Sequence, residues 1–214
     1  ERIGRAKEAL GSSVTILGHH YQHDEVIRFA DYRGDSLELS RRAAEAREAR
    51  YIVFCGVRFM AETAAILCAP DQVVIQPVEE ALCPMARMAS ARTAMEAWEV
   101  LSRLFGPGLV PITYQNSTAE VKAFIGQRGG AVCTSSNARQ LFEWAFRVGT
   151  HILFLPDEHL GRNTALDMGL PESAVGLWDP ADPAPPAAFA PARVVVWRGY
   201  CSVHVRMTPE DVRR

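Results

Sequence analysis

The chain has 214 residues, of which 48% are hydrophobic, and its formal net charge is −2. That length can bury one sizeable core or two modest ones, and a nearly neutral chain without a basic face is not expected to bind nucleic acid. The sequence has no run of about 18 apolar residues and no signal-peptide pattern, so we expect no membrane partner and a cytoplasmic location. Five cysteines at irregular spacing indicate reduced thiols rather than a disulfide framework.

Short aliphatic runs alternate with helical patterns along the whole chain. The runs predict buried parallel strands at residues 13–18, 51–57, 72–78, 109–114, 131–136, 151–157 and 192–199. The helical patterns lie at residues 36–49, 58–69, 92–105, 118–129 and 136–148. This alternation predicts an α/β fold with three-layer αβα domains, in which helices cover short parallel sheets.

The first run leads directly into GHHYQ at residues 18–22. A buried imidazole is costly unless its polar edge is hydrogen-bonded, so these rings are either satisfied core residues or part of a site. In open α/β sheets, ligands bind beyond the carboxyl ends of the strands. The residues just after each run are therefore the first places to look for function.

The second half of the chain repeats features of the first half. The matching positions are Tyr21 with Tyr114, Ser36 with Ser135, Thr63 with Thr164, and Cys83 with Cys201. The spacing between partners grows along the chain, and we attribute the largest increase to a surface loop rich in proline and alanine at residues 179–192. These matches predict a duplicated α/β unit with its junction in residues 84–90, giving domains at 1–88 and 89–203.

Two serines occupy expected helix starts, Ser36 after Asp35 and Ser135 after Thr134. A serine at such a place usually caps the helix by accepting a hydrogen bond from a first-turn amide. The same place can hold phosphate or carboxylate, because free amides and the helix dipole favour an anion. Both functions are compatible with the residues.

The cysteines divide into two groups. Cys55, Cys68 and Cys133 lie within apolar runs and are expected to be small core residues. Cys83 and Cys201 follow the last strand of each copy, so they are the candidate metal ligands, although their spacing alone is a weak signal. Thiolates suit zinc or an iron–sulfur cluster, and either site needs more than two ligands.

The most distinctive motifs of the chain are GHHYQ, GDSLELSRRAAE, FCGVRFMAETA, PITYQNSTAEVKAF, VCTSSNA, FLPDEHLGRNTA and WRGYCSVHVR. Taken together, they resemble quinolinate synthase, an iron–sulfur enzyme of bacterial NAD biosynthesis. The resemblance implies three similar α/β domains around one [4Fe-4S] cluster, which is held by one cysteine from each domain and keeps one iron open as a Lewis acid. It also implies condensation of iminoaspartate with dihydroxyacetone phosphate to quinolinate, with loss of phosphate and water, and possibly an enzyme partner that supplies iminoaspartate.

By position, the resemblance implies roles for nine residues. The metal ligands would be Cys83 and Cys201; the catalytic residues His19, Tyr21, Tyr114 and His204; and the substrate-binding residues His19, Ser36, Tyr114, Asn116 and Ser135. It implies no role for His20, and it assigns no step to Asp157, His159, Arg162 and Asn163, which lie in a family-like motif. Asp35 is expected to support the turn at Ser36.

The sequence departs from the family pattern at its carboxyl end. The family's third domain, with its own cysteine, has no counterpart here, so residues 204–214 are interpreted as its start and the chain alone is expected to be inactive. Two other classes stay open: a cytoplasmic binding module for a phosphorylated metabolite without a cluster, and a zinc-dependent hydrolase using Cys83, Cys201 and a histidine.

Overall fold

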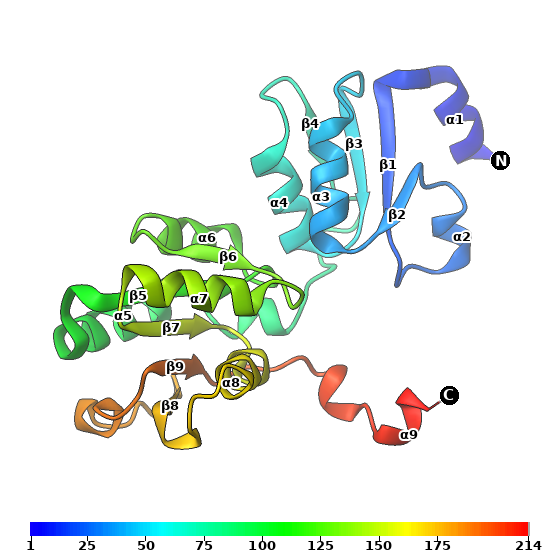
Figure 1. Ribbon diagram of the computed structural model, residues 1–214. Coiled ribbons are helices and arrows are strands. Elements are labelled where there is room, and N and C mark those ends of the chain that lie inside the picture. Colours follow the sequence, from blue (N-terminus) through cyan, green and yellow to red (C-terminus); the bar gives the residue numbers. More distant parts are fainter. Residues whose placement is uncertain (214) are drawn as a thin grey trace. The chain divides into compact units, whose positions relative to one another are not determined.

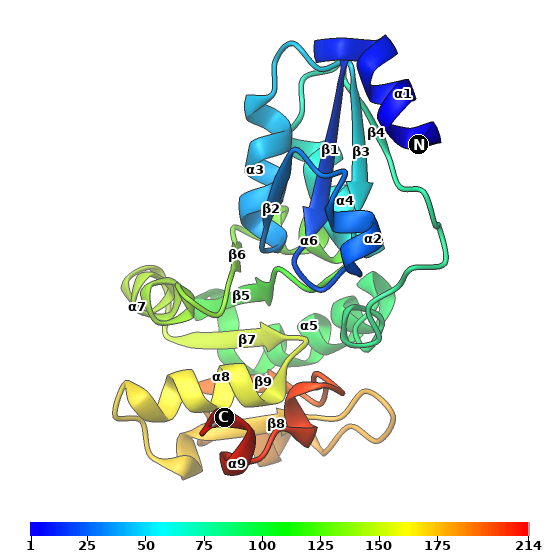
Figure 2. The same cartoon turned by 90° about the vertical axis from the view of Figure 1, so that its right-hand side faces the viewer.

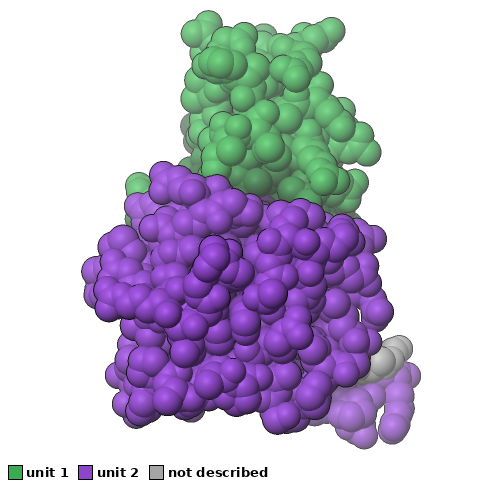
Figure 3. All heavy atoms as spheres, turned by 60° about the vertical axis from the view of Figure 1, so that its left-hand side comes forward, with its two compact units in different colours: residues 1–83 green, residues 84–214 purple. Residues whose placement is uncertain are grey.

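The computed structural model describes residues 1–213 and divides the chain into two compact units, Glu1–Cys83 and Pro84–Arg214, which Figure 3 colours separately. We call them unit 1 and unit 2. The division falls at the start of residues 84–90, where the sequence places the junction; the domain bounds 1–88, 89–203 and 204–214 stay predictions. Within the described residues, no helix is both long and apolar enough to span a membrane.

Unit 1 is an α/β unit whose strands all run parallel, in the order β2-β1-β3-β4 (Figure 1). Its strands are β1 (Val14–His19), β2 (Tyr32–Gly34), β3 (Tyr51–Cys55) and β4 (Val73–Ile75). Its helices are α1 (Arg2–Leu10), η1 (Gly11–Ser13), α2 (Asp24–Ile27), α3 (Ser36–Glu45) and α4 (Arg58–Leu67).

The core of unit 1 lies between its sheet and the paired helices α3 and α4. Leu17 on β1, Leu39 on α3 and Phe54 on β3 are fully buried there. Near the end of β1, Gly18 lies against α2, and a Cβ atom at this position would come within 2.7 Å of Ile27. Glycine at this position lets the segment after the strand fold tightly over it.

Unit 2 has a larger parallel sheet, in the order β6-β5-β7-β9-β8. Its strands are β5 (Leu109–Tyr114), β6 (Ala131–Cys133), β7 (His151–Leu155), β8 (Val175–Trp178) and β9 (Val194–Trp197). Its α-helices are α5 (Ala91–Phe105), α6 (Ala119–Gly126), α7 (Ala138–Val148), α8 (Glu158–Asp167) and α9 (Pro209–Val212). Its 3-10 turns are η2 (Met85–Arg87), η3 (Gly106–Gly108), η4 (Glu172–Ala174), η5 (Pro186–Phe189) and η6 (His204–Arg206).

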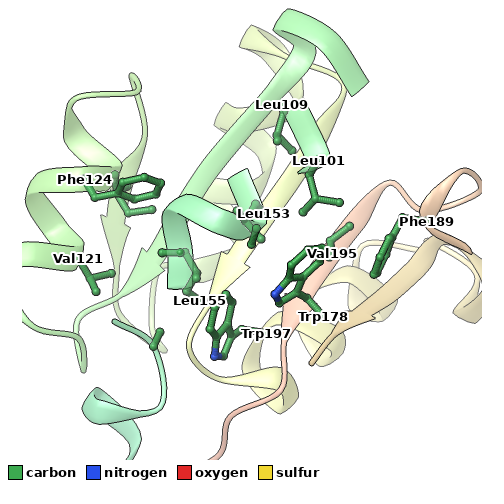
Figure 4. Packing of buried hydrophobic residues seen from close by; sticks show 14 of the residues in the cluster. Leu101, Leu109, Val121, Phe124, Leu153, Leu155, Trp178, Phe189, Val195 and Trp197 are labelled. Atoms are coloured by element: carbon green, nitrogen blue, oxygen red, sulfur yellow. The ribbon is translucent and has the colours of Figure 1, made fainter. Parts of the chain in front are cut away.

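Alternate residues of the unit 2 strands face two separate cores. On β7, Leu153 and Leu155 pack with α5 and α6 (Figure 4), whereas Ile152 and Phe154 pack with α7 and α8. In Figure 2, α5 accordingly lies behind the sheet and α8 in front of it. A strand that is buried on both faces has a continuous run of apolar residues, and such runs are what made the strands of this sheet predictable from the sequence. The α/β fold class with helix-covered parallel sheets is confirmed.

The strand register shows how the two units correspond. Leu17 of β1 pairs with the first residue of β2, and Ile112 of β5 pairs with the first residue of β6, so the two six-residue strands match position by position. His19 therefore corresponds to Tyr114, since each ends its strand. The match of Tyr21 with Tyr114 expected from the sequence is wrong by two residues.

Two further features of unit 2 differ from expectation. Strand β8 has no counterpart in unit 1, so the insertion before Cys201 includes a strand as well as a loop. Residues 179–192 are also more than a surface loop, because they contain η5, whose Phe189 is 2% exposed and packs 5.5 Å from Trp178 between ring centroids (Figure 4). The aromatic contact anchors the proline-rich segment to the core.

Candidate functional site

A pocket of about 570 Å³ opens in unit 2 at the carboxyl end of its sheet. Its lining residues are Tyr114, Ser135, Asp157, His159, Leu160, Asn163, Cys201, His204, Val205 and Met207. They come from the ends of β5 and β6, the start of α8 and the segment after β9. Four residues proposed from the sequence thus meet in one place, at the edge where parallel α/β sheets bind ligands.

Tyr114 is the least accessible polar ring of this pocket. The pKa of its phenol is raised to about 12, mainly by burial; the hydrogen bond with Ser135 acts against this change, whereas Asp157, Cys133 and Cys201 contribute to it. The phenol therefore carries its proton at neutral pH and can donate a hydrogen bond. Ser135 is at once a pocket residue and the partner of Tyr114.

The start of α8 supplies a second wall. The carboxylate of Asp157 caps this helix, with its Oδ1 accepting a hydrogen bond from the Leu160 amide at 3.0 Å, and the residue is only 6% exposed. His159 and Asn163 lie one helical turn apart and also line the pocket. The sequence marks this motif as family-like but gives it no role. Strands β7 and β9 are neighbours in the sheet, so α8, which follows β7, lies beside Cys201, which follows β9; the sequence does not show this strand order.

Arg162 belongs to the same motif but does not line the pocket. Its guanidinium forms ion pairs with Glu158, one turn earlier on α8, and with Glu172 in η4. Glu172 lies outside α8, so we interpret Arg162 as a residue that fastens α8 to the η4 turn.

The third wall is the segment that follows β9. Cys201 is half-buried and in no disulfide, and its carbonyl oxygen accepts a hydrogen bond from the Val205 amide at 3.2 Å. This bond closes a turn that leads into η6, which begins at His204. The side chains of His204 and Val205 are exposed, and both still line the pocket.

In unit 1, the GHHYQ rings gather at the end of β1, whose last residue is His19. The His19 and His20 rings stack with their centroids 4.4 Å apart, and the Tyr21 ring meets them edge-on at 4.7 and 4.5 Å. His20 Nδ1 lies 3.0 Å from the Gly34 carbonyl oxygen, whereas Tyr21 is 76% exposed. His20 is thus a ring with a structural partner, and Tyr21 is open to solvent.

His19 differs from a free histidine. The pKa of its imidazole is lowered from 6.5 to about 4, mainly by burial and also by the nearby His20, while Asp35 opposes the change. The ring is therefore neutral at pH 7 and can accept a proton or a hydrogen bond, whereas an unperturbed histidine would be partly protonated there.

Neither predicted serine caps a helix. Ser36 is the first residue of α3, and the cap is Asp35, whose Oδ1 accepts from the Leu37 and Glu38 amides at 3.0 and 2.9 Å. Ser135 lies in a turn ahead of α7, which begins at Ala138. The expected support of the Ser36 turn by Asp35 is confirmed, and the capping function expected of the serines is wrong.

Comparison with known proteins places the chain in a family. The family model described as "NadA: Quinolinate synthetase A protein" matches residues 1–214. Quinolinate synthases of Bacillus velezensis and Halalkalibacterium halodurans are 50% identical over 213 residues and 49% over 214 residues, respectively, each covering 99% of this chain. That of Acidobacterium capsulatum is 52% identical over 222 residues, covering 100% of it. The chain belongs to the quinolinate synthase family.

The chain spans 58% of the length of each of these three relatives. The resemblance read from the motifs is confirmed.

The remaining site residues of the family pattern are not among those that line the pocket. Asn116 is half-buried in the turn after β5 and does not line it; His19, Tyr21, Ser36 and Cys83 belong to unit 1. Of the three cysteines expected in the core, Cys133 is 1% exposed, while Cys55 and Cys68 are half-buried, and burial raises the pKa of all three thiols.

The donor chemistry can be tested against the iron–sulfur cluster that the family implies. Among residues 1–213, no three His, Cys, Asp or Glu side chains group as a cation site. Cys201 nevertheless fits the part of a single ligand, because its thiol lies outside any disulfide and lines an open pocket. Soft sulfur ligands of this kind are those that hold iron–sulfur clusters.

Proposed function

We propose that the protein carrying this chain is a quinolinate synthase, which condenses iminoaspartate with dihydroxyacetone phosphate to quinolinate and releases phosphate and water. The observation that carries the proposal is the convergence of Tyr114, Ser135, Cys201 and His204 on one pocket, in a chain of this family. These side chains come from three separate segments, at the end of β5, after β6 and after β9, so the sequence alone does not force them together.

Cys83 and Cys201 would hold a [4Fe-4S] cluster together with a cysteine from the part of the relatives that this chain does not span. When bound, the cluster would supply a Lewis acid at its one open iron. The remaining chemistry falls to side chains of this chain.

In unit 2, the pocket is suited to binding anionic oxygens. Tyr114 keeps its proton at neutral pH, so its phenol can donate to a carboxylate, a phosphate or a developing oxyanion. Ser135 shares a hydrogen bond with that phenol and can fix its direction. We assign His159 and Asn163 as further polar contacts, because both line the same wall.

In unit 1, His19 is the proposed proton acceptor. Its low pKa leaves the imidazole neutral, so it can take a proton from a substrate carbon or hydroxyl. Tyr21, whose ring lies edge-on to His19, is assigned as the donor to a leaving hydroxyl. Asp35 already occupies two first-turn amides of α3, so the anion contact proposed there rests on the Ser36 hydroxyl.

Anaerobic purification of the full-length protein tests this proposal against the two other classes. A brown protein with about four iron and four sulfide per chain supports the quinolinate synthase. A colourless protein containing zinc supports a hydrolase that uses Cys83, Cys201 and a histidine. A colourless, metal-free protein that binds a phosphorylated metabolite supports a binding module.

A further inference from the structure

The segment that leads into Cys201 is held by a methionine from another part of unit 2. The sulfur of Met88 lies 3.3 Å from the backbone nitrogen of Tyr200, which donates its N–H to it. The carbonyl oxygen of the same methionine accepts a hydrogen bond from the Trp197 indole N–H at 2.9 Å. Met88 thus contacts this segment through both its backbone and its side chain.

The backbone around Met88 is held in place by a turn and by buried neighbours. It follows turn η2, where its amide donates to the Met85 carbonyl oxygen at 3.0 Å. Met85, Ala86 and Ala89 around it are at most 4% exposed. Its partner Trp197 is fully buried in the α5/α6 core (Figure 4). Neither side of the contact can shift without disturbing a packed core.

The opposite side of the segment is held as well. The Gly199 carbonyl oxygen accepts a hydrogen bond from the Glu158 amide at the start of α8, at 2.8 Å. A Cβ atom at Gly199 would lie 2.2 Å from the Pro156 carbonyl oxygen and 3.3 Å from the Met88 Cβ, so only glycine fits between them.

These two hydrogen bonds act on a single peptide group. The carbonyl of Gly199 and the N–H of Tyr200 belong to one planar amide, whose oxygen is held by α8 and whose hydrogen is held by Met88. Fixing both ends of that plane fixes the direction in which the chain continues to Cys201. Tyr200 itself has a 45% exposed side chain, so its backbone is the part that is held.

We propose that Met88 is a positioning residue for Cys201, setting the place of its thiol through the Gly199–Tyr200 peptide. The inference rests on the proposed function, in which Cys201 ligates the cluster. A metal ligand is most effective when the groups around it fix its orientation before the metal binds.

The test compares three variants of the full-length protein. Met88→Leu keeps the apolar side chain and removes the sulfur acceptor, whereas Met88→Gln offers an oxygen that can accept from the Tyr200 amide. Met85→Leu is the matched control, a methionine of the same turn whose side chain is 2% exposed. The first readout is the rate at which iodoacetamide alkylates Cys201 in metal-free protein, measured by mass spectrometry.

We expect Met88→Leu to raise that rate about three- to tenfold, the range that one lost neutral hydrogen bond allows. Met88→Gln and Met85→Leu should stay within about twofold of the natural protein. Cys133, buried in the same unit, should show no change in any variant. In protein loaded with iron and sulfide, Met88→Leu should also lose iron to a chelator faster by a similar factor.

An unchanged Cys201 rate in Met88→Leu would overturn the proposal, as would a parallel rise at Cys133, which would mean general destabilisation. Equal effects of Met88→Leu and Met88→Gln would also overturn it, because packing and not the acceptor of the Tyr200 amide would then hold the segment. Should Met88→Leu fail to fold, Trp197→Phe removes the indole donor to the Met88 carbonyl, together with some ring volume from the core, and should raise the same rate with Cys133 unchanged; no rise would overturn the proposal. If the natural protein holds no cluster but the alkylation pattern appears, the proposed function fails and the positioning role stands.

Discussion

Tyr114 and His19 occupy the same place in their two sheets, and burial acts on both in the same sense. It raises the pKa of the phenol to about 12 and lowers that of the imidazole to about 4. In each case the uncharged form is favoured, because a half-buried ring loses water that would stabilise its charge. At neutral pH the two strand ends therefore present a neutral donor and a neutral acceptor.

The state of His19 can be measured directly. Because its pKa in the folded chain is lowered, the unfolded chain binds the proton more readily, so acidification from pH 6.5 towards 4 should destabilise unit 1. We expect the imidazole carbon-bound protons of His19 to titrate near pH 4 by NMR, and His19→Asn to flatten the loss of stability over that range. Titration near pH 6.5 would show that the ring is not desolvated.

The proposed ligands predict a contrast among cysteines. In the full-length protein, Cys83→Ser or Cys201→Ser should abolish the visible absorbance of the cluster, since each removes a thiolate ligand. Cys55→Ser and Cys68→Ser are matched controls, being half-buried thiols of unit 1, and should leave that absorbance in place. An intact spectrum in either ligand variant would remove that cysteine from the site.

The serines should matter for substrate and not for the cluster. Ser36→Ala and Ser135→Ala each remove a hydroxyl proposed to contact a phosphate or carboxylate, and a hydrogen bond to a charged group contributes about 1.5–3 kcal/mol. We expect substrate affinity to fall accordingly, measured as KM or Kd, with the iron content unchanged. If both variants bind substrate normally, the hydroxyls contact no substrate.

At the level of single residues, the sequence predicts the strand ends well, but one predicted equivalence between the two units is wrong. The sequence matches Tyr21 with Tyr114 because both are tyrosines after a strand. The strand registers of the two sheets instead show that Tyr114 and His19 occupy equivalent positions. The register depends on which residues of neighbouring strands hydrogen-bond, and no local pattern reports this. For the same reason, the motif at Asp157 could not be connected to Cys201 before the neighbours of β7 were known.

At the scale of elements, the start of α3 shows which residue stabilises a helix end. Asp35 satisfies two amides of the first turn, while Ser36 lies inside the helix. We expect Asp35→Ala to lower the free energy of unfolding of unit 1 by about 1 kcal/mol, as loss of an N-cap does. Ser36→Ala is the control and should change it by less than about 0.5 kcal/mol. Urea unfolding followed by circular dichroism checks both, and equal losses would contradict the assignment.

The elements predicted from sequence are those with strong periodicity. All seven predicted strands and five predicted helices are present, with ends that differ by a few residues. Strand β2 was missed because its three residues, YRG, form no apolar run, and α1 because none of its residues is buried. In α8, Gly161 weakens the helical pattern, yet a Cβ there would lie 2.6 Å from Phe154, so glycine is what lets the helix pack closely on the sheet.

At the scale of the whole molecule, the chain holds two α/β units built on one plan. Each has the same four-strand order at its centre, and unit 2 adds β8 at its edge. The relatives are longer, since the chain spans 58% of each of the three compared. The sequence could predict the repeat and the family, because both depend on local motifs. It could not predict the pocket, because four distant segments meet there only in the folded unit.

The most direct measurement is an anaerobic quinolinate assay on the full-length protein and on residues 1–214 alone, each reconstituted with iron and sulfide and given iminoaspartate and dihydroxyacetone phosphate. We predict quinolinate and a stable cluster from the full-length protein only, because residues 1–214 supply two of the three proposed thiolates. Absence of quinolinate from the full-length protein would contradict the proposed function. A stable cluster with turnover from residues 1–214 would instead contradict the proposed ligand set.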